Sequence, residues 1–178
     1  ILISDDFSRT DPDQYRTPED GKLKIKALPN EVRYYTYTSM LSGDADICVT
    51  VQIPHNFSDA RIAGGVIFGG DEGGDLNAFI ISPTGKGGVV RIANQKFESP
   101  MGPPQPVKGL NAAPGAKNRV RVMVRGSSAT FYVNNQPFAA TFNGPLPNGA
   151  GKVGIIVSSE PSKKDSWKFA NFRATGPQ

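Results

Sequence analysis

The sequence has little of the chemistry on which metal centres and nucleophilic enzymes depend. It contains one cysteine, Cys48, and one histidine, His55. A single cysteine excludes an intrachain disulfide and a cysteine-based metal site, and a zinc site would need more imidazole or thiolate ligands than the chain has. Cys48 lies in the alternating stretch DADICVTVQI, with neither a CxxC motif nor a helix start beside it. We therefore interpret it as a packed or half-buried thiol and not as a nucleophile.

Long apolar runs and a basic stripe are also missing. No run approaches the roughly 20 apolar residues that span a bilayer, so we expect no membrane insertion. The 20 Lys and Arg against 16 Asp and Glu give a net charge of +4, but the basic residues are scattered along the sequence. A nucleic-acid-binding protein more usually shows clustered basic residues with interleaved aromatics, so we expect no nucleic-acid partner.

The chain begins ILISDDF, with neither an initiator Met nor a signal peptide. Read as a trimmed mature start, this would predict an exported protein, extracellular or periplasmic. Nothing in the sequence sets an oligomeric state.

Glycine and proline, in contrast, are plentiful, with 20 and 15 residues placed between short β-branched and aromatic runs. Most runs alternate apolar with polar residues, which is the period of a strand with one buried face. No segment repeats apolar residues at helical spacing over several turns. The pattern predicts one all-β domain over residues 1–178, a sandwich or barrel of antiparallel strands. The predicted strands are KLKIKAL, VRYYTYT, DICVTVQI, AGGVIFG, NAFIIS, GVVRIA, NRVRVMVRG, ATFYVN, PFAATF, KVGIIVS and WKFANFRAT.

The stretch NRVRVMVRGSSATFYVNNQPFAATF predicts a three-stranded meander. The alternate valines of VRVMV form one face, and Phe131 and Val133 continue it after a turn at GSS. NNQP turns the chain again, because asparagine tolerates a positive φ and Pro137 cannot continue a central ladder. We interpret Asn134 and Asn135 as turn formers.

The segments DDFS, DGKLKIKA, VRVMVRGSSATFYVNNQPFA, GKVGIIVSS and FANFRAT follow one another in a familiar order. This order resembles that of bacterial concanavalin A-like (laminin G-like) jelly-roll domains, including those related to the 3-keto-disaccharide hydrolase domain family. The resemblance covers nearly the whole chain and implies a jelly-roll β-sandwich of two antiparallel sheets, with the first and last strands paired. It also implies carbohydrate recognition on the concave face or the rim loops. The chain departs from the family at Ala170, where an acidic residue often precedes NF, and this argues against a structural calcium site near the chain ends.

Hydrolytic chemistry would need groups that the sequence does not bring together. Jelly-roll glucanases carry their carboxylates on one strand as Glu-x-Asp-x(-x)-Glu, and the glutamates here belong to no such cluster. No GxSxG elbow accompanies His55, which follows Pro54 in an expected loop. We therefore expect no catalytic residues. The alternative, implied by the resemblance, is a hydrolase of 3-keto glycosides in which His55 and Asp59 form the acid/base pair.

The glycine-rich loop GGDEGGDLNAF carries three oxygen-bearing side chains, those of Asp71, Asp75 and Asn77. Such side chains can surround a hard cation such as Ca²⁺, and Asn77 could also contact a sugar. The loop is not an EF-hand and occurs once, so a plain polar connection is the alternative. We expect no other cofactor.

Aromatic residues supply the predicted sugar platforms. VRYYTYT places Tyr35 and Tyr37 on one face and Tyr34 on the other. Aromatic faces pack against the C–H patches of sugar rings, and packing inside the sandwich is the alternative for Tyr35 and Tyr37. Trp167, in the closing strand, is expected to be buried.

The remaining candidates lie on the face that does not form the core. If their strands are neighbours, guanidinium and aromatic groups share a face that suits an acidic or polyhydroxylated ligand. The Pro/Gly-rich connection ESPMGPPQPVKGLNAAPGAK is expected to wall a ligand groove or to cover an edge strand. The parity of their positions in the alternating strands assigns the following residues to the non-core face: Thr50, Gln52, Phe79, Arg91, Arg121, Arg125 and Tyr132.

These patterns predict a carbohydrate-binding module or accessory domain with a carbohydrate as its partner. One alternative is the glycoside hydrolase described above, and another is a structural or protein-interaction sandwich without a small-molecule site. The predicted ligand contacts are Tyr35, Tyr37, Asn77, Arg91 and Tyr132.

Overall fold

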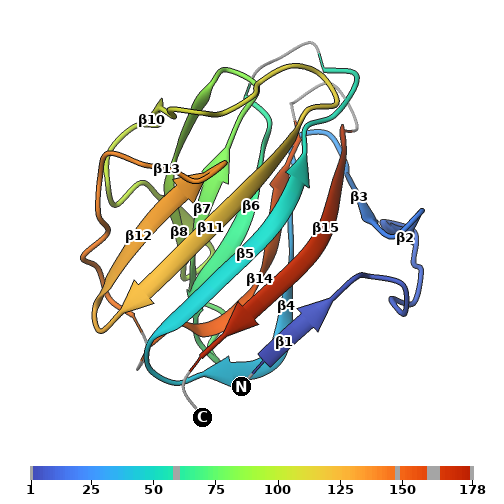
Figure 1. The fold of residues 1–178 in the computed structure, drawn as a ribbon. Coiled ribbons are helices and arrows are strands. Elements are labelled where there is room, and N and C mark those ends of the chain that lie inside the picture. The colour runs from blue at the N-terminus through green and yellow to red at the C-terminus, as the bar shows by residue number, and fades with distance from the viewer. Residues whose placement is uncertain (1, 58–60, 147–148, 160–164, 177–178) are drawn as a thin grey trace.

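The computed structural model describes residues 2–57, 61–146, 149–159 and 165–176. In these ranges the chain forms antiparallel strands joined by turns, with no α-helix, and the strands make two sheets packed face to face (Figure 1). The all-β sandwich that the sequence predicts is therefore confirmed. The described part of the chain has no helix long and apolar enough to cross a membrane.

Sheet A contains eight strands and forms the front layer in Figure 1. Its strand β5 (Ala45–Gln52) lies between β11 (Lys117–Arg125) and β15 (Asp165–Thr175). The first strand, β1 (Leu2–Asp5), pairs with β15, the last, as the resemblance implied. The order continues with β12 (Ser128–Val133) and β13 (Gln136–Pro137) beyond β11, and with β3 (Leu23–Ala27) and β2 (Arg16–Pro18) beyond β15.

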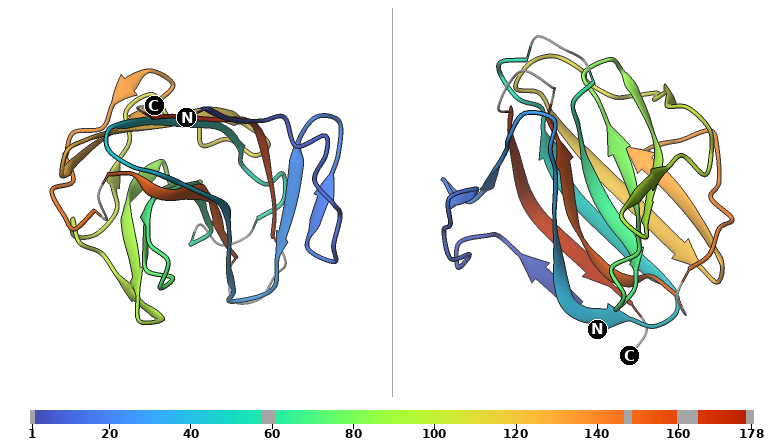
Figure 2. Two further views of the ribbon diagram at one scale, coloured as in Figure 1. Left: turned by 90° about the horizontal axis from the view of Figure 1, so that it is seen from below. Right: turned by 180° about the vertical axis from the view of Figure 1, so that it is seen from behind.

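Sheet B contains seven strands and lies behind sheet A in Figure 1. The left view of Figure 2 shows that sheet B is curved and that its hollow side is turned away from sheet A. In spatial order its strands are β10 (Gln105–Pro106), β8 (Lys86–Ala93), β7 (Leu76–Ile81), β6 (Ala63–Gly70), β14 (Gly151–Ser158) and β4 (Val32–Leu41), with β9 (Lys96–Glu98) paired to β8.

The predicted meander forms with the predicted faces. β11 buries Val120, Val122 and Val124, and β12 buries Phe131 and Val133 beside them. The arginine and methionine residues at the intervening positions of β11 lie on the outer face of sheet A, because successive side chains of a strand point to opposite faces. Alternation therefore predicts this part of the sheet residue by residue.

The turn after β12 has the predicted geometry, but the strand that follows is shorter than predicted. Asn134 and Asn135 have φ angles of 50° and 64°, in the region that asparagine enters more readily than other non-glycine residues. Gln136 and Pro137 pair with β12 as the short strand β13, and Phe142 forms an isolated bridge with Ala129 of β12. The N–H of Phe138 donates to the carbonyl oxygen of Phe131 at 2.8 Å, so PFAATF follows β12 with interrupted pairing and does not form a full strand.

Aromatic side chains from both sheets meet in the core. Phe79 of β7 stacks on Phe131 of β12, with the ring centroids 4.6 Å apart. The parity assignment of Phe79 to the non-core face is therefore wrong, since β7 is buried on both faces and its pattern does not identify the core side. Trp167 is fully buried, as predicted, and its ring lies so close to Gly64 that a Cβ there would come within 2.5 Å of Cε3.

The long connection between β9 and β11 covers the edge strand β8. Gln105 and Pro106 pair with β8, and Val107 is buried against the main core. Pro103 and Pro104 line a pocket on the hollow side of sheet B. The connection thus covers an edge strand and also walls a groove.

β15 contains a β-bulge that changes which of its residues point into the core and which point outward. Its register with β5 shifts between Ala170 and Arg173, and Asn171 within the bulge has a φ of 53°. As a result Phe169 and Phe172 both point into the core although two residues separate them. Asn171 and Arg173 are left exposed on the outer face of sheet A.

Candidate functional site

Sheet B has a second apolar face on its hollow side. The side chains of a strand alternate between faces, so the residues of β6, β7, β8 and β14 that do not enter the main core line this side. They form a separate apolar cluster of Ile67, Leu76, Ala78, Ile92 and Ile156, with Val32, Ile80 and Val90 packed against it.

The sequence of β6 explains why both faces of the sheet are apolar. AGGVIFGG is buried at every position and has no polar alternation. Gly65 lies between Ile156 on one neighbouring strand and Ile80 on the other. A Cβ at Gly65 would overlap the carbonyl oxygen of Phe79. Glycine therefore lets the strands approach closely and adds no side chain to the hollow side of the sheet at this position.

Two adjoining pockets occupy this hollow, and we call them together the concave groove. The larger, of about 380 Å³, extends toward the turn after β7 and toward Pro103 and Pro104. It shares Ala63 and Ile80 with the smaller, of about 120 Å³. The smaller pocket is lined by Val32, Ala63, Ile80, Val90, Phe97, Ile156, Val157 and Ser158.

Two exposed aromatic side chains flank the concave groove. Phe97 of β9 is 59% exposed and lines the smaller pocket. Tyr34 of β4 is 44% exposed and lies opposite Ile156 in register, so it is on the same face. β4 is the last strand on one side of sheet B, and β9 pairs with β8 toward the other side. The two rings therefore stand on opposite sides of an apolar floor.

Polar groups gather at one end of the concave groove. Arg61, Ser82, Thr84 and Lys86 line the larger pocket, and Ser158 lines the smaller. The hydroxyls of Ser82 and Thr84 hydrogen-bond to each other, and the N–H of Thr84 donates to Ser82 Oγ at 3.1 Å. The groove therefore combines an apolar floor with hydrogen-bonding groups at its rim.

Tyr35 and Tyr37, predicted as ligand contacts, face the other way. Both pack against the main core. The Tyr37 ring lies 4.7 Å from that of Phe172, its hydroxyl donates to Asp5 Oδ2 at 2.8 Å, and its burial raises the pKa of the phenol. The guanidinium of Arg16 covers the Tyr35 ring at 4.6 Å. Both tyrosines make internal contacts, and their neighbour Tyr34 is the one open to solvent.

The loop between β6 and β7 is held by its own hydrogen bonds. The Asp71 carboxylate accepts from the N–H of Asp75 at 2.9 Å, and Asp75 accepts from Asn94 at 3.0 Å and from Arg91 at 3.4 Å. Asn77 lies opposite Arg91 in register and is fully buried. Within the described ranges no group of three or more His, Cys, Asp or Glu could hold a metal ion. Calcium at Asp71, Asp75 and Asn77 stays a prediction, and it would require Asp75 to exchange Arg91 for the cation.

His55 is exposed at one end of β5, beyond Gln52. Its Nε2 lies 3.3 Å from Nε2 of Gln52, and a Cβ on Gly115 would overlap its ring. Asp59, its partner in the hydrolase alternative, lies outside the described residues.

Arg91 and Tyr132 do not share a surface. Tyr132 is on sheet A, with the Arg121 guanidinium 5.7 Å from its ring centre, whereas Arg91 is on β8 of sheet B. The predicted shared face required its residues to lie on neighbouring strands. Phe79 and Arg91 do not belong to that face, because β7 and β8 are strands of sheet B. Of the predicted ligand contacts, only Asn77 and Arg91 are neighbours across strands.

Sequence reasoning missed Phe97 and gave Tyr34 no role. Phe97 stands alone among polar residues in NQKFES, and an isolated large apolar side chain in a hairpin is the signal that could have identified it. Tyr34 was placed correctly opposite Tyr35 and Tyr37, but alternation does not tell which face is buried.

No family model matches the sequence, and no curated protein matches it. The fold, in contrast, is similar to solved structures. The Lotus tetragonolobus seed lectin aligns with a TM-score of 0.65 at 10% identity, over 98% of this chain and 97% of the lectin. A functionally unknown protein from Saccharomyces cerevisiae aligns with a TM-score of 0.64 at 14% identity, over 93% of each chain.

A third structure is an endo-β-galactosidase from Clostridium perfringens that releases GlcNAcα1-4Gal. It aligns with a TM-score of 0.63 at 9% identity, over 97% of this chain and 61% of the enzyme. These likenesses, together with the strand order, show the concanavalin A-like jelly-roll fold that the sequence implied. The relation to the 3-keto-disaccharide hydrolase domains stays a prediction.

Proposed function

We propose that this protein is a carbohydrate-binding module that takes a neutral glycan chain into the concave groove. The observation that carries the proposal is the pair of exposed rings, Tyr34 and Phe97, on opposite sides of an apolar floor. Sugar rings present C–H patches that pack on aromatic and aliphatic surfaces, while their hydroxyls require hydrogen-bond partners at the edge.

The groove supplies both kinds of contact. A sugar ring lying over Ile80 and Ile156 would bring its hydroxyls toward the rim, where Ser82 and Thr84 are held in place. Lys86 adds a charged donor, and hydrogen bonds to charged groups are stronger than neutral ones. The seed lectin and the endo-β-galactosidase among the fold neighbours support a carbohydrate as the ligand class.

The lining of the groove favours binding over hydrolysis. The described residues of its two pockets include no carboxylate. Glycosidases of the usual kind place two carboxyl groups across the scissile bond. Sugar contacts in this groove would therefore hold a glycan without cleaving it.

The experiment compares the removal of exposed apolar side chains at the groove and away from it. Soluble neutral polysaccharides, namely β-glucan, galactan, mannan and xylan, are cast in retardation gels, and the migration of each variant gives its affinity. Tyr34→Ala and Phe97→Ala should each weaken retention roughly 5- to 30-fold, which corresponds to the loss of about 1–2 kcal/mol of stacking. Leu2→Ala removes a side chain that is equally exposed, 59%, but lies on sheet A, and it should leave retention unchanged.

Tyr35→Ala provides a second comparison. Because Tyr35 packs against the main core, this change should lower the melting temperature, whereas Tyr34→Ala should not. The proposal is wrong if neutral glycans are retained equally by Tyr34→Ala, Phe97→Ala and the unmodified protein, or if none of the polysaccharides is retained at all.

A further inference from the structure

The outer face of sheet A, opposite the concave groove, carries a second hollow. Two pockets of about 340 Å³ and 200 Å³ adjoin at the bulge of β15 and share Thr50 and Asn171. Among the residues that line them are the basic side chains Lys22, Lys117, Arg119, Lys168 and Arg173. We call the two pockets together the cationic furrow.

Strand register gathers these charges from distant parts of the sequence. Lys117 on β11 and Lys168 on β15 both lie opposite Gln52 of β5, one from each side. Arg119 lies opposite Thr50, and Arg173 lies opposite Cys48. Basic residues that are scattered along the sequence therefore lie on one surface.

Most of these charges have no acidic partner. In the described ranges, Lys22, Lys117, Arg119 and Arg173 form no ion pair. Lys168 is paired with Glu19 at 2.8 Å at the margin of the furrow. Arg119 contacts the Cys48 sulfur at 3.7 Å, which leaves the rest of its guanidinium available.

Two carboxylates outside the furrow, those of Asp46 and Glu19, each interact with several cations. A hydrogen bond from Arg121 holds the pKa of the Asp46 carboxyl below its usual value, and Arg125 and Arg119 add to the effect. A hydrogen bond from Lys168 lowers the pKa of Glu19, and Lys24 and Lys22 contribute as well. Each acidic group thus faces several cations.

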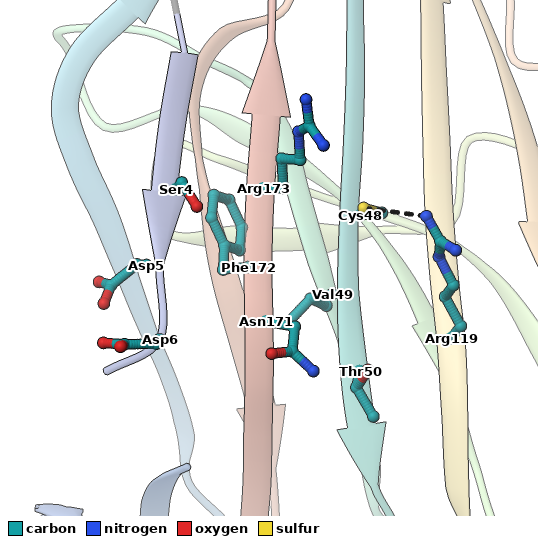
Figure 3. A pocket seen from close by; sticks show the side chains of 10 residues that line it. All are labelled: Ser4, Asp5, Asp6, Cys48, Val49, Thr50, Arg119, Asn171, Phe172 and Arg173. Carbon is teal, nitrogen blue, oxygen red and sulfur yellow. Dashed lines mark hydrogen bonds between the residues drawn. The ribbon is translucent and has the colours of Figure 1, made fainter. Parts of the chain in front are cut away.

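Two further carboxylates, Asp5 and Asp6, line the pocket of about 340 Å³ together with Arg119 and Arg173. Figure 3 shows both carboxylates pointing away from Asn171 and Arg173. Both carboxylate oxygens of Asp5 already accept hydrogen bonds within the protein, from the Tyr37 hydroxyl and from the N–H of Phe7. The side of the pocket toward Arg119 and Arg173 is therefore cationic.

Neutral hydrogen-bonding groups lie between the charges. Thr50, Gln52 and Asn171 line the furrow. Gln52 is 9% exposed, and its Oε1 is buried without a hydrogen-bond partner among the described residues. A buried acceptor of this kind is costly unless a ligand or solvent donates to it, and a sugar hydroxyl is such a donor.

We propose that the cationic furrow binds an acidic polysaccharide, with Arg119 and Arg173 on its carboxylate or sulfate groups and Gln52 and Asn171 on its hydroxyls. Guanidinium groups suit both anions because they donate two parallel hydrogen bonds. This site is separate from the proposed neutral-glycan groove and does not depend on it.

The furrow is less suited to nucleic acid. Single strands bind on aromatic side chains that stack with successive bases. The aromatic residues of the furrow, Phe169 and Phe172, are buried under β15 and present no ring to a ligand.

The test is a binding measurement with two acidic probes and one neutral one. Polygalacturonate carries carboxylates, dextran sulfate carries sulfates, and unmodified dextran carries neither. The double variant Arg119→Gln/Arg173→Gln should bind the better acidic probe at least about tenfold more weakly. The control, Lys96→Gln/Lys108→Gln, removes the same charge from exposed positions outside the furrow, and its affinity should change less than about twofold. Binding of one acidic probe alone identifies its anionic group and supports the proposal.

Three outcomes would overturn it. The first is an equal loss in the control, which would mean that net charge alone drives binding. The second is that a DNA duplex or anionic lipid vesicles bind as tightly as the acidic polysaccharides and with the same loss in the double variant. The third is that neither acidic probe binds. If Arg119→Gln/Arg173→Gln does not fold, Lys22→Gln/Lys117→Gln tests the same furrow and should show the same weakening.

Discussion

Single residues next to one another on a strand belong to different surfaces of this molecule. Tyr34 is open to the hollow of sheet B, and Tyr35 packs against the main core under Arg16. On sheet A, Arg121 is held by Asp46, while Arg119, two positions earlier on the same face, contacts only the Cys48 sulfur through its side chain among the described residues. The role of a residue here is therefore set by its neighbours on adjacent strands and not by its type alone.

The Arg121–Asp46 pair leads to a prediction about pH. The pair is bidentate, with Arg121 Nε donating to Asp46 Oδ1 at 2.8 Å, and this hydrogen bond lowers the pKa of the carboxyl. A carboxyl whose folded pKa is depressed stabilises the fold above its unfolded pKa of about 3.9, and the effect disappears as the pH falls through the folded pKa. Because the pair is partly exposed, we expect Asp46→Asn to cost on the order of 1 kcal/mol at pH 7.

The measurement is urea unfolding of both proteins at pH 7 and near pH 3. The difference in unfolding free energy between Asp46→Asn and the unmodified protein should be largest at pH 7 and should shrink at the lower pH. Asp11→Asn removes an exposed carboxyl from a loop and should show no such change. A difference that stays constant or grows on acidification would contradict the assignment.

At the scale of elements, irregular features of strands position the furrow and protect the sheet. The bulge in β15 places Asn171 on the outer face between the inward Phe169 and Phe172, and Arg173 on the same outer face after Phe172. The short strand β10 closes the exposed edge of β8, and an open edge would be a template for pairing with another chain. Neither feature interrupts the core.

The bulge itself can be tested through its backbone. Asn171 has a φ of 53°, where a β-branched side chain is strained. Asn171→Val should lower the unfolding free energy by about 1–2 kcal/mol, and Asn171→Gly should change it by less than about 0.5 kcal/mol. Ala170→Val places the same side chain at the adjacent position, where φ is not positive, so it should cost less than Asn171→Val. Equal losses for the two valine variants would show that bulk, and not φ, sets the cost.

At the scale of the whole molecule, the sandwich separates two chemically different faces. The hollow side of sheet B is apolar with an aromatic pair, and the outer side of sheet A is cationic. The core lies between them, as the left view of Figure 2 shows for the two sheets. A close-packed interior of this kind holds the two faces at a fixed separation.

This separation predicts independent binding. The affinity for a neutral glycan should be the same, within about twofold, whether or not a saturating acidic polysaccharide is present, since coupling requires a shared state or a shared surface. Raising the salt concentration should weaken the binding of the acidic ligand and leave the binding of the neutral ligand unchanged, because salt screens exposed charges. Competition titrations by isothermal calorimetry measure both effects. Displacement of one ligand by the other would mean that the two proposals describe a single site.

Alternation was sufficient to predict much of this architecture. In β11 and β12 it separated buried valines from exposed arginines, and the positive φ of Asn134 and Asn135 followed from residue type. It failed where strands are buried on both faces, as in β6 and β7, because a continuous apolar run contains no information about which side meets the other sheet. The sites could not be predicted, because they depend on strand order and on a bulge that places Arg173 on the same face as Arg119.

The pairing of β1 with β15 has a mechanical consequence. Leu2 lies opposite Thr175, so the two chain ends meet at the same end of one antiparallel pair, as Figure 1 shows. The hydrogen bonds of such a pair run perpendicular to the strands. Tension applied between the ends would act along these bonds and open them one after another, starting at Leu2, instead of shearing them all at once. The sandwich would therefore peel from its N-terminal strand under low force and would be far more resistant to a pull applied along β5.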